Sequence, residues 1–364
     1  MNDAHLPKNA DAKYIQYIEH IEALKKEPLG KAIPKALFKK NVLKSLAGFV
    51  ISYSLYIGSI IAIAYSPHWS VSLLLLLPAG LGGWGLHCIA HDCGHGSFSN
   101  SRIVNTLVGH LALIPLLYPF HAWRHVHNMH HSATNNLEMD TDWRPISKSV
   151  YDRMPFIDRV VYLFTRSFGF WAGTVHYWWV SAFRPSFFPQ KKQRNEVRRS
   201  MLFVIIAGGA IITLLAMYTG LHGVLWYFVL PLLATHAWFS VTTLMHHTEE
   251  DVPFLERKNW SLNGSRILLT TDYIYPKWLL LLTHNISIHA AHHVSPTVPF
   301  YNLPKAQAAL EAAYPGMIRQ APFTFKTLWR IITRCHFYDP QTGYYQSFSQ
   351  AKNTSAEKTA HNAD

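Results

Sequence analysis

Four apolar stretches, each close to the length of a membrane-spanning helix, limit this chain to a small set of folds. They cover residues 46–65, 71–90, 202–218 and 224–244, and a helix needs about 20 mostly apolar residues to cross the hydrocarbon core of a bilayer. Only short connectors separate the first stretch from the second and the third from the fourth. The sequence therefore predicts an all-α integral membrane protein with four transmembrane helices arranged as two hairpins.

The distribution of Lys and Arg predicts which side of the membrane the hairpin ends face. The two short connectors contain neither residue, whereas lysines are frequent in residues 25–44 and basic residues in 191–199. Basic residues concentrate on the cytoplasmic side of membrane proteins. We therefore expect both termini and the long middle segment in the cytoplasm, with the protein in a membrane such as the bacterial inner (cytoplasmic) membrane.

Composition argues against several other classes of protein. Charged residues make up only 15% of the chain, whereas soluble globular proteins carry roughly 25%. The net charge of +12 suits contact with anionic lipid headgroups, and no basic stretch has the interleaved aromatics of a nucleic-acid-binding segment. The three cysteines are too few and too irregularly spaced for a disulfide framework or a thiolate zinc site. We expect reduced thiols and no nucleic-acid partner.

Two further apolar segments, 103–120 and 160–182, are interrupted by polar or charged residues. Asn105 and His110 interrupt the first, and Arg166 and His176 interrupt the second. We expect both segments to lie as helices on the membrane surface rather than to cross the bilayer. A single additional span would put the histidine clusters on opposite sides of the membrane, whereas a pair of additional spans would not.

The chain contains 23 histidines, and eight of them form three clusters beyond the predicted cytoplasmic ends of the spans. The clusters are His91 and His95; His127, His130 and His131; and His289, His292 and His293. Residues three and four apart share one face of a helix, so each cluster, if helical, points its imidazoles in one direction. Imidazole suits iron, zinc, copper and nickel, and eight imidazoles are too many for one ion. The pattern predicts a helical cap that binds two metal ions.

Other residues near the clusters are candidates for a ninth ligand or for supporting roles. His246 and His247 lie just past the fourth span, and either one could complete the coordination. Asp140 is expected to orient an imidazole by accepting its second N–H group. His246, His284 and Asn285 are further candidates for such support, whereas His125 should point away from the ligand face. Carboxylates are scarce in the clusters, unlike in the soluble di-iron bundles that use Glu-x-x-His motifs.

The three clusters, their order and their placement around two hairpins resemble the membrane fatty-acid desaturase superfamily. The run WRHVHNMHH at 123–131 and the stretch from 284 to 302 are similar to the boxes of acyl-lipid desaturases. The runs HDCGHGSF at 91–98 and CHFYDP at 335–340 are similar to the delta-12 (omega-6) branch of cyanobacteria and plastids. The resemblance predicts a desaturase domain at 41–348, between a cytoplasmic N-terminal tail at 1–40 and a polar C-terminal tail at 349–364.

The resemblance also implies the chemistry. It implies a centre of two Fe ions (Fe2+/Fe3+), O2 as co-substrate, and two electrons from an external donor of the ferredoxin or cytochrome b5 type. The implied substrate is an acyl chain of a membrane lipid, which receives a cis double bond. A His-Thr pair after the last span recurs in this family, which makes His247, followed here by Thr248, the ninth expected ligand.

Three alternatives stay open at this point. Omega-3 desaturases share most of these features, so the position of the double bond is undecided. Hydroxylases and ketolases of the same di-iron superfamily, acting on a lipid or carotenoid, need the same clusters and differ only in product. A metal or haem transporter would place ionisable groups inside its spans, whereas the clusters here lie beyond them. We therefore favour an oxidoreductase, in which the cofactor supplies the oxidant and the protein supplies position.

Overall fold

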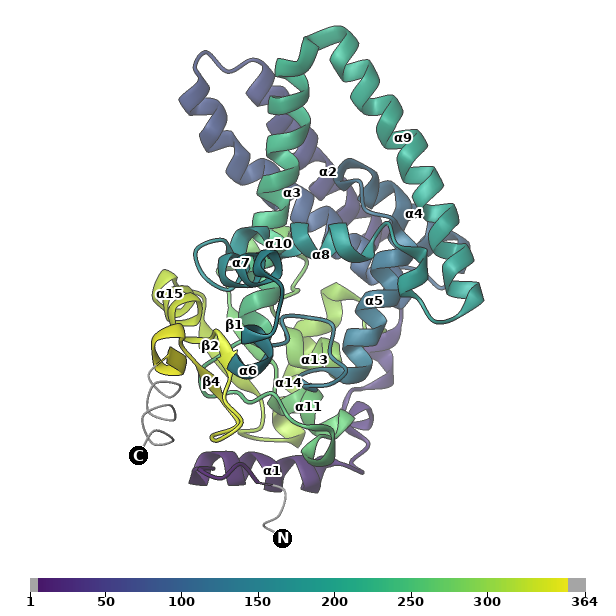
Figure 1. Ribbon diagram of the computed structural model, residues 1–364. Helices are drawn as coiled ribbons and strands as arrows, with labels where there is room; N and C mark the ends of the chain where they lie inside the picture. The colour runs from purple at the N-terminus through teal and green to yellow at the C-terminus, as the bar shows by residue number, and fades with distance from the viewer. Residues whose placement is uncertain (1–5, 353–364) are drawn as a thin grey trace.

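The computed structural model describes residues 6–352, and helices account for most of them (Figure 1). Three helical runs are long and apolar enough to cross a membrane: α2 (Val42–Ala64), α3 (Trp69–His95) and the run 191–247. The last run comprises α9 (Lys191–Val224), the π-helical turn η7 (Leu225–Val229) and α10 (Leu230–His247). Gly220 breaks it with a φ of 67°, and the chain turns back at the far end of α9 in Figure 1. The expected all-α membrane fold is confirmed, and its long helices form two hairpins.

Small residues allow α2, α3 and α10 to pack closely. A Cβ atom added at Gly82 of α3 would lie 2.6 Å from the backbone nitrogen of Tyr56 in α2. A Cβ atom added at Gly80 would lie 2.7 Å from the carbonyl oxygen of Ala234 in α10. Both distances are shorter than any real contact, so only glycine fits at these positions. The glycines of α3 thus serve close helix packing, as small residues do in many membrane bundles.

Helices α3 and α10 extend beyond the apolar stretches that the sequence predicts. Helix α3 continues past residue 90 as far as His95, and α10 continues past residue 244 as far as His247. Both extensions end in buried or half-buried histidines. The same helices that form the membrane bundle therefore deliver histidines to one end of it.

The two interrupted apolar segments form short helices. The first contains α4 (Arg102–Leu113) and η4 (Ile114–Leu116), which meet α5 (Phe120–Ala133) at a bend of 101°. The second contains α7 (Phe156–Thr165), η5 (Phe170–Ala172) and α8 (Gly173–Ser181). Each of these helices is shorter than the roughly 20 residues that a span needs. Their location on the membrane surface stays a prediction.

The remaining elements form a cap at the end of the bundle where the histidines lie (Figure 1). Its helices are α1 (Ala12–Leu24), α6 (Lys148–Asp152), α11 (Leu262–Leu268), α12 (Lys277–Leu282), α13 (His289–Val294), α14 (Leu303–Ala313) and α15 (Phe325–Arg334). Strand β1 (Thr271–Ile274) pairs in parallel with β2 (Arg319–Pro322), and β3 (Phe337–Tyr338) pairs antiparallel with β4 (Tyr345–Gln346). Short turns of 3-10 helix lie at Leu29–Ala32, Lys35–Phe38, Pro185–Phe187, Arg257–Asn259 and Phe300–Asn302.

The N-terminal segment is part of this cap. Tyr14, Ile21 and Leu24 of α1 are buried in a core shared with α11, α13 and α14. The polar segment that the sequence assigns to a tail at 1–40 therefore folds against the domain from residue 12 onward. At the other end, most of the tail expected at 349–364 lies outside the described residues.

Candidate metal centre

All nine histidines that the sequence predicts as ligands come together in the cap. His91 and His95 come from α3, His247 from α10, three from α5 and three from α13. Each predicted cluster is helical, as expected, and the turns that carry the histidines meet in the fold. The imidazoles fall into two adjoining groups.

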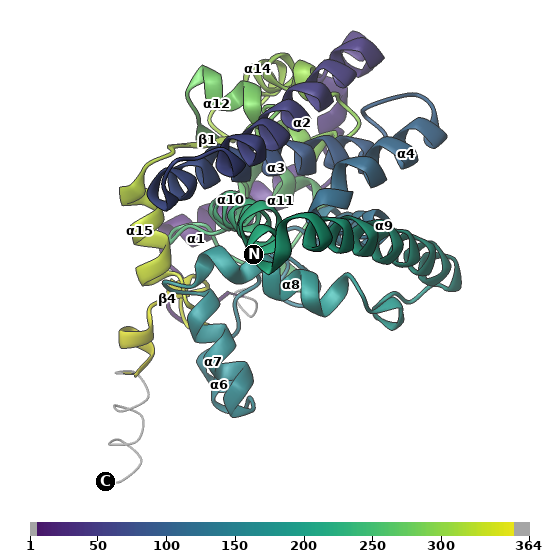
Figure 2. The same ribbon diagram turned by 90° about the horizontal axis from the view of Figure 1, so that it is seen from above.

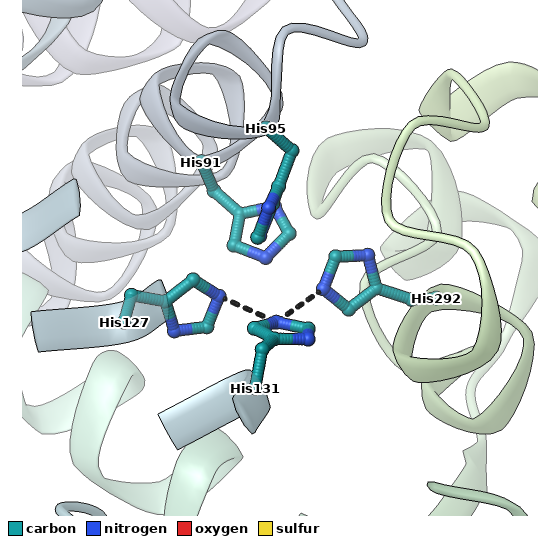
Figure 3. Close-up of side chains that lie close together, drawn as sticks. All are labelled: His91, His95, His127, His131 and His292. Carbon is teal, nitrogen blue, oxygen red and sulfur yellow. Dashed lines mark hydrogen bonds between the residues drawn. The ribbon is translucent and has the colours of Figure 1, made fainter. Parts of the chain in front are cut away.

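The first group contains five imidazoles from three helices. His91, His95, His127, His131 and His292 place one nitrogen each so that all five atoms lie within 4.8 Å of one another. Figure 3 shows their rings directed at a common centre, with His131 between His127 and His292. The Nε2 atom of His131 lies 2.9 Å from Nε2 of His127 and 3.0 Å from Nε2 of His292.

The second group contains four imidazoles. The ligand atoms of His130, His247 and His293 also lie within 4.8 Å of one another. His289 joins them, since its Nε2 atom lies 2.9 Å from Nε2 of His247 and 3.0 Å from Nε2 of His293. The Nε2 atoms of His130 and His247 are 3.2 Å apart.

These distances and the lowered pKa of the three α13 rings fit bound metal. Imidazole nitrogens that bind one ion at about 2.1 Å lie about 3 Å from each other. Burial lowers the pKa of His289, His292 and His293 well below the usual range of histidine, and the neighbouring imidazoles lower it further. Neutral imidazole is the form that binds metal. The histidine groups therefore fit a metal site.

Asp140 contacts the second group in the way the sequence predicts. Its carboxylate accepts a hydrogen bond of 2.7 Å from Nδ1 of His130, which leaves the Nε2 lone pair of that ring free to face the site. The same carboxylate accepts the backbone N–H groups of Asn135, at 2.6 Å, and Asp142, at 3.0 Å. The loop after α5 therefore holds Asp140, and Asp140 holds the ring of His130.

Asp272 is a supporting residue that the sequence analysis missed. Its carboxylate accepts the backbone N–H groups of His289, at 2.7 Å, and Ala290, at 2.8 Å, and so anchors the first turn of α13. Burial raises the pKa of Asp272 to about 7, although these two N–H groups oppose the rise. Asp272 lies in β1, 17 residues before His289, and no helix or strand spacing connects the two. The pairing of β1 with β2 is what places it there.

The other supporting candidates lie at different distances from the two groups. The Nδ1 atom of His246 donates to the carbonyl oxygen of Thr271 at 2.7 Å, and its ring stacks on that of His289 with centroids 4.2 Å apart. His284 instead bonds Ser52 at 2.8 Å, and Asn285 donates to the carbonyl oxygen of Phe300 at 3.0 Å. Any influence of His284 and Asn285 on the metal ligands stays a prediction.

His125 points away from the ligand face of α5. Its Nε2 atom lies 2.8 Å from the carboxylate of Glu196 at the start of α9, and Arg124 donates to the same carboxylate at 2.8 Å. His125 therefore forms a contact between α5 and α9 and does not join the first group, although it is only two residues before His127.

A cavity of about 470 Å³ adjoins both groups. Imidazoles of His91, His127, His130, His246 and His289 form part of its wall. Aromatic side chains line much of the rest, namely Trp84, Tyr118, Trp123, Trp143, Tyr162, Tyr177 and Phe239. Charged and hydroxyl side chains, among them Asp140, Asp142, Arg144 and Arg166, complete the lining. A cavity with apolar walls and convergent polar groups is typical of a small-molecule site. The cavity can hold an apolar molecule beside these imidazoles.

Comparison with known proteins gives consistent matches. The family model for fatty acid desaturases matches residues 67–327. A protein of Picosynechococcus sp. named sn-1 oleoyl-lipid 12-desaturase is 36% identical, over 87% of this chain and 91% of the relative. A protein of Synechocystis sp. with the same name is 34% identical, over 89% and 92%. The chloroplastic omega-6 fatty acid desaturase of Spinacia oleracea is 32% identical, over 88% of this chain and 71% of the relative.

Proposed function

The chain belongs to the fatty acid desaturase family, and from this premise we propose that it introduces a cis double bond into an acyl chain of a membrane lipid. The position that we propose is delta-12 (omega-6), supported by relatives that are named 12-desaturases or omega-6 desaturases. The observation that carries the proposal is the meeting of nine imidazoles in two adjoining groups, four of which, His91, His127, His130 and His289, line one cavity.

The nine histidines are proposed to hold two iron ions. His91, His95, His127, His131 and His292 would hold one ion, and His130, His247, His289 and His293 would hold the other. The bound irons supply the activation of O2 that oxidation of an unactivated methylene pair requires. The overall reaction converts –CH2–CH2–, O2, two electrons and two protons into –CH=CH– and two water molecules. The electrons come from a separate donor protein of the ferredoxin or cytochrome b5 type.

The protein's own contribution is to position the acyl chain. Trp84, His87 and Phe239 stack against one another along the cavity, with centroid distances of 5.1 Å between Trp84 and His87 and 4.1 Å between His87 and Phe239. These rings give the wall a fixed shape and exclude water from the reacting carbons. The methylene pair that is oxidised is then the pair that the wall holds beside the imidazoles, because positioning within about an ångström controls rate.

We further propose that the cap, with both termini, lies on the cytoplasmic side of a bacterial inner membrane. Helices α1 and α15 lie at the same end of the bundle as α13 (Figure 1), and basic residues flank that end of the long helices in the sequence. Basic flanks face the cytoplasm in membrane proteins. This location gives a soluble electron donor access to the cap.

The decisive experiment expresses the chain in a host whose lipids contain only monounsaturated acyl chains. Gas chromatography of the acyl chains should then detect a new diene with its double bonds separated by one methylene group. A strain carrying the His292→Ala variant is the matched control and should form none. A hydroxylated or keto product would favour the other di-iron reactions, and a product with an omega-3 double bond would contradict the proposed position.

A further inference from the structure

Outside the long helices, large apolar side chains remain exposed on one side of the cap. Phe325 and Trp329 of α15 are 73% and 45% exposed, and Phe168, just after α7, is 68% exposed. The ring of Trp329 lies 5.8 Å from that of Phe168 and 6.0 Å from that of Phe325. We call these three residues the α15 patch. Exposure of three clustered aromatic rings to water is unfavourable, so we expect an apolar surface to cover the patch.

The patch is continuous with surfaces that adjoin the membrane bundle. On one side lies α7, where Phe156, Ile157 and Phe164 are exposed, and on the other lies α12, where Trp278 and Leu281 are exposed. Helix α12 packs on α2 and α3, and η5, which follows α7, packs on α10. Figure 2, which looks down on the bundle, shows α12, α15 and α7 in that order along one side of the molecule.

The opposite face of α15 is fixed to the cap. Ile331 and Ile332 are buried in a core that also contains Tyr273 and Tyr275. Arg330 donates to the buried carboxylate of Glu249 at 2.6 Å, and Arg334 donates to Glu250 at 3.2 Å. Because these contacts fix the helix, its aromatic face stays outward.

The charges beside the exposed face are those of a helix that lies on a bilayer. Lys326 follows Phe325, and Lys277 precedes Trp278, and both lysines are exposed. Lysine next to Trp and Phe at a helix surface is typical of segments that lie in the headgroup region, with the rings in the acyl boundary and the ammonium groups at the lipid phosphates.

We propose that the α15 patch lies on the lipid surface of the leaflet that the cap faces. Together with the exposed residues of α7 and α12, it forms a belt that seats the cap on the bilayer beside the long helices. Aromatic residues collect at this depth in membrane proteins, because their rings are apolar and their edges are polar. The occupant of the patch is thus lipid, and neither a second copy of the chain nor a soluble protein.

This seating would also determine where the cavity meets the membrane. The side of α7 that faces away from these exposed residues lines the cavity. It contributes Tyr162, Thr165 and, directly after the helix, Arg166. Helix α7 therefore separates the lipid surface from the cavity. An acyl chain that reaches the imidazoles from the membrane would have to pass beside this helix. This last point rests on the proposed function, whereas the seating of the patch does not.

Spin labels in the protein reconstituted in phospholipid bilayers test the seating. Labels at Phe325→Cys and Phe168→Cys should collide often with dissolved oxygen, which concentrates in lipid, and rarely with a water-soluble nickel chelate. Leu74→Cys, on an exposed apolar position of α3, is the lipid-facing reference, and Ala308→Cys, on the exposed face of α14, is the aqueous reference. The three native cysteines are buried and should label poorly.

Each outcome decides the proposal. Labels at both patch positions that behave like the Leu74→Cys label support it. Labels that react with the nickel chelate like the Ala308→Cys label overturn it, because the patch is then in water. Labels shielded from both reagents also overturn it, because a protein surface then covers the patch. If Phe325→Cys fails to fold, Phe168→Cys and Trp329→Cys give the same test.

Discussion

Removal of the carboxylate of Asp140 should lower the metal affinity of one group, although Asp140 itself is not a proposed ligand. In the structure Asp140 accepts the Nδ1 hydrogen of His130 at 2.7 Å, so the Asp140→Ala variant leaves that ring without the partner that fixes its orientation. The ring can then rotate or bind through the wrong tautomer. His130 belongs to the second group only, so the first group should keep its ion.

The size of the effect follows from these contacts. Loss of a partner that orients a metal-binding histidine costs about 10-fold to 100-fold in metal affinity, which is about 1.4–2.7 kcal/mol. Asp140→Ala also leaves the buried N–H group of Asn135 unpaired, and a buried donor without a partner costs about 1–3 kcal/mol of folding stability. The Nδ1 hydrogen of His130 and the N–H group of Asn135 bond different oxygens of Asp140. Asp140→Asn keeps only one acceptor oxygen, so it should retain one of these two bonds and show a smaller total loss than Asp140→Ala.

The assay is iron retention against a chelator of graded concentration, with thermal unfolding measured in parallel. Asp140→Ala should lose one of two irons at a chelator concentration at which the unsubstituted protein keeps both. Asp152→Ala is the control, because Asp152 lies on the surface in an ion pair with Lys148. If Asp140→Ala retained both irons as firmly as Asp152→Ala, the role of Asp140 in orienting His130 would be refuted.

Three further predictions follow from other contacts. His130→Ala should abolish desaturation and lower the iron content of the purified protein, whereas His125→Ala, which loses contacts with Glu196 and Phe188 outside the two groups, should retain most of both; equal losses would contradict the ligand assignment. Asp272→Ala should lower the unfolding temperature and the iron content, since it frees two N–H groups of α13 at a cost of about 1–3 kcal/mol; Asp272→Asn should largely rescue both, and no difference between the two variants would argue against the anchor. Gly82→Ala should destabilise the bundle by about 1–3 kcal/mol through overpacking, whereas Gly58→Ala, which meets open space, should not; comparable thermal unfolding of the two would contradict the close packing of α2 and α3.

Much of the site could be predicted from the sequence because its ligands have local patterns. Histidines three and four residues apart share a helix face, so each cluster can be recognised from its spacing without knowledge of the fold. The convergence of the clusters could only be inferred from their number and order. The assignment of individual rings to two groups could not be predicted, since it depends on how α3, α5, α10 and α13 cross.

The rest of the structure depends on contacts between distant segments, which no spacing rule exposes. Asp272 anchors α13 from strand β1, and that strand is held by pairing with β2 from much later in the chain. The N-terminal segment looks polar in sequence, yet Tyr14, Ile21 and Leu24 form one apolar stripe of α1 that completes the core of the cap. In both cases the contact joins separate elements, and tertiary packing sets the position of the partner.

In each of the pairs His130-His131 and His292-His293, the two adjacent histidines belong to different groups. His130 and His293 belong to one group, and His131 and His292, their immediate neighbours, belong to the other. One turn of α5 and one turn of α13 thus join the two groups rigidly, so the spacing between the groups is tied to the rotation of these two helices. Neither group can be moved alone, so a distortion of α13 that began at one group would be transmitted to the other.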